Sequence, residues 1–212
     1  MTCPEYGLGE RIADGIIHVL GVGGSLIAVA ILIAIAVSTL PLGVTASLAV
    51  YGLAMIAMFG FSAAYHLVPL PDWKLFLRKL DQAAIFIKIA GTYTPFALVK
   101  MGGFAGYTLF SVVWAVALSG AAAKLFIEPK RDWFSVPLYL ALGWAGLAAI
   151  QPLVMSVPTE SLILLGVGGA IYTVGVLFHI WDSLPYQNAI WHLFVLAGTA
   201  CHFAAVTLAV FD

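Results

Sequence analysis

The stretch IIHVLGVGGSLIAVAILIAIAVST, residues 16–39, decides the fold class. It contains no Asp, Glu, Lys or Arg over 24 consecutive residues. As an α-helix it would extend about 36 Å, which is enough to cross the roughly 30 Å hydrocarbon core of a bilayer. This stretch therefore predicts a membrane-spanning helix.

Six more apolar runs of similar length follow, separated by gaps rich in proline, glycine or charge. The runs are too long and too uniformly apolar for the alternating strands of a membrane barrel. The sequence predicts an all-α integral membrane protein, with residues 1–212 forming a single seven-helix domain. The predicted helices are about 16–39, 46–69, 80–99, 105–126, 134–154, 160–180 and 189–210.

The composition agrees with a protein whose main partner is the lipid bilayer. Hydrophobic residues make up 63% of the chain and charged residues only 9%, against about 25% charged in ordinary soluble domains. A chain so poor in charge could not cover a water-facing surface. The net charge of -1 gives no support for a nucleic-acid partner, and no feature of the sequence indicates an oligomeric state.

The lysines and arginines predict the orientation, because they are enriched in cytoplasmic loops. With seven helices, seven of the nine basic residues fall on one side of the membrane, the side of the N-terminus. We therefore predict a cytoplasmic N-terminus and an external C-terminus. The seven residues are Arg11, Lys74, Arg78, Lys79, Lys124, Lys130 and Arg131.

Polar side chains within the predicted helices gather near the same, cytoplasmic face. They are His18, Ser62, His66, Asp81, His179, Asn188 and His192. Spacings of four place Ser62 with His66, and Asn188 with His192, on one face of a helix. The same spacing links Glu10, Asp14 and His18. Ionisable groups inside spanning segments are costly, so these residues are functional candidates.

These residue types favour a zinc site. Hydrolytic zinc centres commonly use three protein ligands and one water whose pKa falls to about 7, and a nearby carboxylate can accept its proton. Any one of these histidines could instead simply reach interfacial water. His202 lies deeper and is expected to hydrogen-bond between helices, whereas Lys88 either approaches the site from within the membrane or extends to the interface.

At these residues the chain resembles the haemolysin III family, the bacterial branch of the progestin and adiponectin receptor family. The matching motifs are E-x3-D-x3-H at 10–18, SAAYH at 62–66, LDQAAIF at 80–86, IAGTYTPF at 89–96 and PYQNAIWHLFVLAGTACHF at 185–203. The resemblance implies a seven-helix protein of the bacterial cytoplasmic (inner) membrane. It also implies a zinc ion held near the cytoplasmic face.

Residue by residue, the resemblance implies that His66 and His192 are the first and last zinc ligands, and that Asp81 and Ser62 surround the metal water. Asn188 stands where the family has the first histidine of an H-x3-H motif. Three outcomes are open at this position. The metal site is lost or weakened, Asn188 holds a water that completes it, or His179 substitutes as the middle ligand.

The favoured function is a zinc-dependent hydrolase that acts within the bilayer on a lipid amide or ester. It depends on the His66, His192 and Asp81 group and on the resemblance to receptors with ceramidase-like activity. In this hypothesis the metal polarises the carbonyl, and Asp81 is the general base. The alternatives are a non-enzymatic sensor or receptor, a pore-forming haemolysin, and a transporter with helices broken near GTYTP, 91–95.

Overall fold

The computed structural model describes residues 7–127 and 135–212, and their regular structure is entirely helical. The elements are α1 (Leu8–Thr39), α2 (Leu42–Leu67), α3 (Pro71–Pro95), η1 (Phe96–Met101), α4 (Gly103–Phe126), α5 (Ser135–Gly143), η3 (Ala145–Ala149), α6 (Ile150–Ser156), α7 (Thr159–His179) and α8 (Gln187–Phe211). They make seven membrane-length apolar spans, with η1 extending α3 and with α5, η3 and α6 forming the fifth. The predicted seven-helix fold is confirmed, whereas the orientation of its N-terminus stays a prediction.

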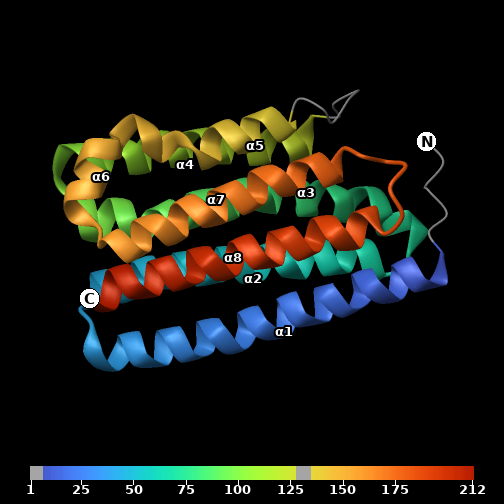
Figure 1. The fold of residues 1–212 in the computed structure, drawn as a ribbon, viewed down its shortest axis with the longest axis horizontal. Coiled ribbons are helices and arrows are strands. Elements are labelled where there is room, and N and C mark those ends of the chain that lie inside the picture. Colours follow the sequence, from blue (N-terminus) through green and yellow to red (C-terminus); the bar gives the residue numbers. More distant parts are fainter. Residues whose placement is uncertain (1–6, 128–134) are drawn as a thin grey trace.

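The helices run side by side, and the start of α1 and the end of α8 lie at opposite ends of the bundle (Figure 1). Each of the first four spans packs against the next, and α8 packs against both α7 and α1. The last helix therefore returns to the first. This contact brings residues about 180 positions apart in the sequence to the same end of the bundle.

The outward faces of the bundle are apolar, as a lipid-facing surface requires. Large exposed hydrophobic residues follow the outside of α1, including Ile27, Ile31 and Val37. Inside, Leu48, Tyr51 and Val206 join one buried core, and a second core lies between α3 and α4. Because nonpolar side chains cover both the outside and the inside of the described helices, the chain is an integral membrane protein.

Two helices begin well before their predicted starts. We predicted a start at 16 for the first helix and 80 for the third, whereas α1 begins at Leu8 and α3 at Pro71. An apolar run marks only the part of a helix that lies in hydrocarbon, and the helix continues into the polar interface. Proline suits the first helical position because its missing N–H would have no intrahelical partner there.

The fifth span, predicted as one helix over 134–154, is divided into α5, η3 and α6. Residue 134 lies outside the described residues. Pro152, in the first turn of α6, explains the junction between η3 and α6, since it cannot donate to the carbonyl of Ala148 and its ring clashes with that group. Pro95 does not end the third span, which continues as the π-helical η1 to Met101. The turn after it uses Gly102 and Gly103, whose φ angles of 57° and 53° favour glycine.

Candidate metal centre

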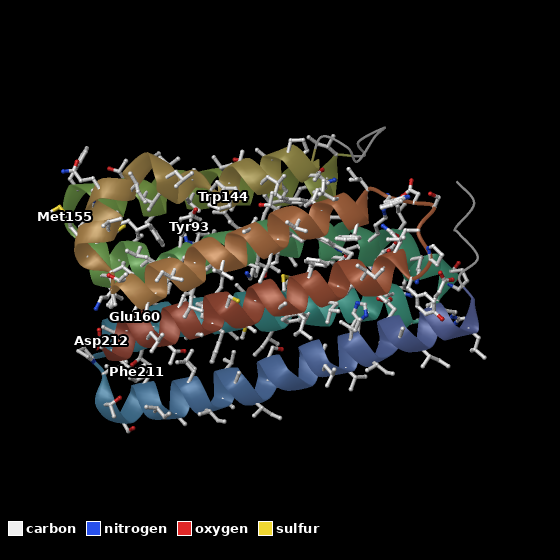
Figure 2. The ribbon with its side chains drawn as sticks, viewed as in Figure 1. Tyr93, Trp144, Met155, Glu160, Phe211 and Asp212 are labelled. Atoms are coloured by element: carbon white, nitrogen blue, oxygen red, sulfur yellow. The ribbon has the colours of Figure 1, made fainter. Side chains whose placement is uncertain are left out.

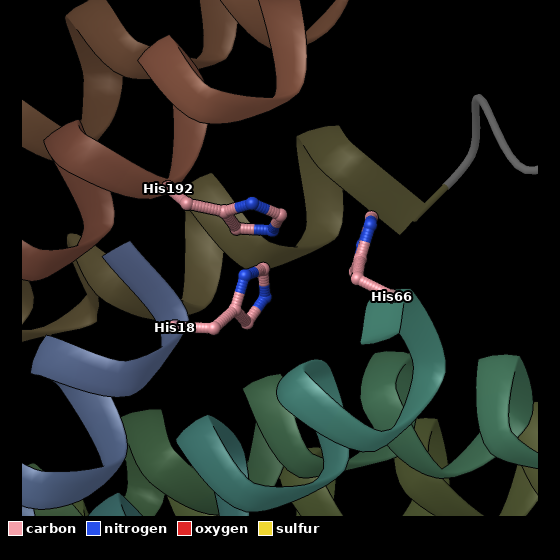
Figure 3. Close-up of side chains that lie close together, drawn as sticks. All are labelled: His18, His66 and His192. Atoms are coloured by element: carbon pink, nitrogen blue, oxygen red, sulfur yellow. The ribbon is translucent and has the colours of Figure 1, made fainter. Parts of the chain in front are cut away.

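Three histidines from three helices meet near the N-terminal end of the bundle. His18 from α1, His66 from α2 and His192 from α8 point toward one another (Figure 3). One ring nitrogen of each lies within 4.8 Å of the others. The ring centroids are 4.4 Å apart for His18 and His192, and 4.6 Å for His66 and His192.

Asp14 contacts all three imidazoles. Its Oδ1 lies 2.6 Å from His192 Nδ1 and 3.6 Å from His18 Nδ1, and its Oδ2 lies 3.5 Å from His66 Nδ1. Asp14, His18 and His192 are all less than 9% exposed. A buried carboxylate amid three imidazoles compensates the polarity of the group and restricts the orientation of the rings.

The hydrogen bonds to Asp14 determine which ring nitrogens carry a lone pair. His18 Nδ1 donates to the Asp14 carbonyl oxygen at 2.8 Å, and His192 Nδ1 donates to the Asp14 carboxylate. In a neutral imidazole the other nitrogen then carries the lone pair. His18 and His192 therefore each present Nε2 as the atom that can bind a metal.

Ser62 and Asp81, the predicted catalytic residues, lie beside this group. Ser62 Oγ is 3.3 Å from His18 Nε2 and also interacts with the Asp81 carboxyl group. Asp81 is close enough to His192 and Arg78 to interact electrostatically with both. The structure thus brings together four of the residues predicted for the site: His66, His192, Ser62 and Asp81.

Glu10, at the first turn of α1, links that helix to the start of α8. Its Oε1 accepts from the Tyr186 backbone N–H at 2.8 Å, and its Oε2 accepts from the Gly7 N–H at 2.7 Å. Tyr186 has a φ of 60°, in the left-handed region, and immediately precedes α8. This contact helps to hold His192 against α1. The E-x3-D-x3-H motif therefore joins a helix-end contact, a carboxylate and an imidazole on one face.

The two residues predicted for the middle ligand, His179 and Asn188, line the same cavity as the three histidines. His179 is exposed at the end of α7, and its ring packs against Trp191 with centroids 4.8 Å apart. Asn188 lies beside the cavity described below, but neither residue belongs to the three-histidine cluster. Their metal-binding roles stay predictions. His18 occupies the third position, a role that the sequence did not assign although the spacing to Asp14 placed both on one face.

A cavity of about 530 Å³ extends from this cluster into the membrane-spanning part of the bundle. Its walls are mainly apolar, and the polar side chains that line it include Lys88, Tyr172 and His202. Tyr93 and Trp144 lie between the helices (Figure 2) and connect the fifth span to its neighbours. Tyr93 Oη donates to the Gly143 carbonyl at 2.6 Å, and Trp144 Nε1 donates to Thr173 Oγ1 at 3.1 Å.

Comparisons with known proteins match almost the whole chain. Residues 9–203 match the protein-family model described as Haemolysin-III related. Hemolysin-3 of Bacillus cereus is 37% identical over 197 residues, which cover 93% of this chain and 90% of the relative. The Hemolysin-3 homolog of Bacillus subtilis (strain 168) is also 37% identical, covering 93% of this chain and 92% of the relative.

A more distant relative is human. The monocyte to macrophage differentiation factor of Homo sapiens is 29% identical over 167 residues, or 74% of this chain and 67% of the relative. No solved structure matches the chain.

Proposed function

Because this chain belongs to the haemolysin III family, we propose that it is a metal-dependent hydrolase that acts within the bilayer on a lipid amide or ester, with zinc as its metal. One observation carries the proposal. Three imidazoles surround a buried carboxylate where a mainly apolar cavity meets the polar end of the bundle. Such a place can receive both a polar scissile bond and the acyl chain attached to it.

The residues present fit a zinc ion. Hydrolytic zinc sites bind the metal through three protein ligands, commonly neutral imidazoles, and leave a position open. His18, His66 and His192 supply that ligand set. The hydrogen bonds that His18 and His192 make to Asp14 through Nδ1 leave the lone pair of each ring on Nε2. When bound, zinc supplies Lewis-acid polarisation of a carbonyl and acidifies a water.

The remaining steps belong to the chain's own residues. Asp81 accepts a proton from the attacking water at a carboxylate oxygen and delivers it to the departing amine or alcohol as the C–N or C–O bond breaks. Ser62 positions that carboxyl group by its interaction with it. Asp14 holds His192 in one tautomer and orientation. The apolar walls bind the acyl chain and exclude bulk water from the reaction.

Turnover by the purified protein tests this proposal. The protein is reconstituted in lipid nanodiscs with zinc and offered lipid amides and esters of several classes. Asp81→Asn should lower turnover by about 10²–10⁴-fold because the general base is lost. Glu160→Gln, at the opposite end of the bundle (Figure 2), serves as the control. No turnover of any class by metal-loaded wild type would contradict the proposal.

The alternative of a pore-forming haemolysin requires a continuous polar path across the membrane. Beyond Lys88 and Tyr172, the described walls of the cavity are mainly apolar and include Trp144, Leu153 and Leu162. This lining disfavours an aqueous pore. Dye release from liposomes that contain the protein would favour the alternative if His66→Ala left the release rate unchanged.

A further inference from the structure

Lys88 is a buried lysine in the middle of a membrane-spanning helix. Only 4% of its surface is exposed, so its side chain does not extend to the interface. Its Nζ donates to Tyr172 Oη at 2.8 Å, and Tyr172 Oη lies 2.5 Å from Thr199 Oγ1. A polar chain thus links α3, α7 and α8 inside the bundle.

No acidic side chain compensates this lysine. Among residues 7–127 and 135–212, no Asp or Glu lies within ion-pair distance of Lys88 Nζ. The phenol of Tyr172 offers a hydrogen bond, and its ring centroid lies 4.6 Å from Nζ. A cation–π contact and one hydrogen bond replace only part of the hydration that an ammonium loses on burial.

The lysine faces the same cavity as the histidine cluster. Lys88 and Asp81 both line it, and seven residues separate them along α3, or about 10 Å of helix. His202 lines the cavity beside Tyr172, with ring centroids 5.4 Å apart. Its buried Nδ1 has no hydrogen-bond partner within the described part of the chain. Because Nε2 of this ring donates to the Leu165 carbonyl oxygen at 3.4 Å, Nδ1 is an acceptor and does not bind an anion, so the capacity to receive one belongs to the Lys88 ammonium, which lines the cavity.

Close packing of α7 and α8 holds this group in place. A Cβ atom at Gly168 would lie 2.4 Å from His202 Cδ2, and one at Gly198 would lie 2.8 Å from Tyr172 Cδ2. Each glycine therefore receives the ring from the other helix. This reciprocal fit limits the movement of Tyr172 and His202 and so preorganises the surroundings of Lys88.

We propose that Lys88 and Tyr172 form an anion-binding subsite, which takes the carboxylate of a single-chain amphiphile whose hydrocarbon lies against the apolar walls of the cavity. The Lys88 ammonium has three N–H donors, of which the contact with Tyr172 uses one, and the Tyr172 hydroxyl can donate to a carboxylate when Thr199 Oγ1 is the donor in their mutual hydrogen bond. The subsite lies about 10 Å from Asp81, so it acts on a different part of the ligand from the histidine cluster. It does not require the metal, and it extends beyond the proposed hydrolase.

Binding of dodecanoate tests the proposal. Full-length protein in nanodiscs is incubated with radiolabelled dodecanoate and a scintillation-proximity support, and unlabelled dodecanoate and dodecanol compete for the site. Wild type should prefer dodecanoate to dodecanol by about tenfold or more, since a hydrogen bond to a charged group is involved. Lys88→Met should remove that preference, Lys88→Arg should retain part of it, and Tyr172→Phe should weaken it less than Lys88→Met does.

Two controls make the outcomes decisive. Lys100→Met changes a lysine outside the cavity and should bind like wild type. His66→Ala disables the histidine cluster and should retain the preference for dodecanoate, so failure of the hydrolase and failure of the subsite give different results. Equal affinities of wild type for dodecanoate and dodecanol, or an unchanged preference in a folded Lys88→Met protein, would overturn the proposal.

Discussion

Two groups of polar side chains line the cavity, and they differ in how far neighbouring side chains compensate their charge. At the end of the bundle, Asp14 provides a carboxylate for three imidazoles, and Ser62 and Asp81 extend the network. About 10 Å deeper along α3, Lys88 has a phenol but no described carboxylate within ion-pair distance. The first group is suited to hold a cation, whereas the second is suited to receive an anion from outside.

The largest effect is expected from removing a cluster histidine. His18→Ala should lower zinc affinity by more than about 100-fold. Losing a ligand should cost more affinity than losing a residue that only orients a ligand, which costs about 10–100-fold. Elemental analysis of purified protein after dialysis against a weak chelator measures this. His179→Ala is the matched control and should keep its metal, since His179 lies outside the cluster. Loss of the metal in His179→Ala and its retention in His18→Ala would show that His179, and not His18, binds the metal.

Removing the charge of Asp14 should have the next largest effect. Asp14→Asn keeps the shape of the side chain but replaces the carboxylate that holds His192. Zinc affinity should fall by about 10–100-fold, as for other residues that orient metal-binding histidines. Competition with a fluorescent chelator provides the measurement. Unchanged affinity, with the same secondary structure by circular dichroism, would show that Asp14 does not position the ligand.

The deeper group should be sensitive to a single methyl group at Gly168. Gly168→Ala places a Cβ within 2.4 Å of His202 and should destabilise the protein by about 1–3 kcal/mol through overpacking. Thermal unfolding in detergent is the measurement. Gly166→Ala on the same helix meets nothing within 4 Å and should unfold like wild type. Equal unfolding temperatures for both variants would contradict the reciprocal packing of α7 and α8.

The smallest effect is expected at Glu10. Glu10→Gln keeps an acceptor for only one of the two backbone N–H groups that the carboxylate binds. It should lower the unfolding temperature slightly and the zinc affinity less than Asp14→Asn does, because it acts on the start of α8 rather than on a ring. If Glu10→Gln bound zinc more weakly than Asp14→Asn does, Glu10 would support the metal site more than Asp14 does, contrary to this expectation.

The sequence predicts most of the fold because the lipid bilayer permits few backbone structures. Backbone groups in hydrocarbon must be paired within the chain, so each long apolar run becomes a helix. The predicted boundaries were wrong at Leu8 and Pro71, since hydropathy detects the hydrocarbon rather than the helix. Hydropathy also does not detect the division of the fifth span, where α5 ends at Gly143 and α6 begins at Ile150, just before Pro152.

The sequence predicts how deep in the membrane the candidate site lies, but it does not predict which of its side chains contact one another. Helical spacing and topology placed His18, His66 and His192 near one end, and the structure brings these three together. The order of helices along the chain does not reveal that α8 packs against α1. Without that contact, His179 was a reasonable substitute for Asn188, and Asp14 had no evident partner beyond His18.

We propose that His18, His66 and His192 together hold one metal ion. Anomalous-difference density from crystals of the full chain, collected at the absorption edge of the metal found by elemental analysis, tests it most directly. One peak is expected among these three imidazoles, with the Asp14 carboxylate on the far side of the His192 ring from the metal. A peak beside His179 or Asn188, or no peak in crystals of metal-loaded protein, would contradict it.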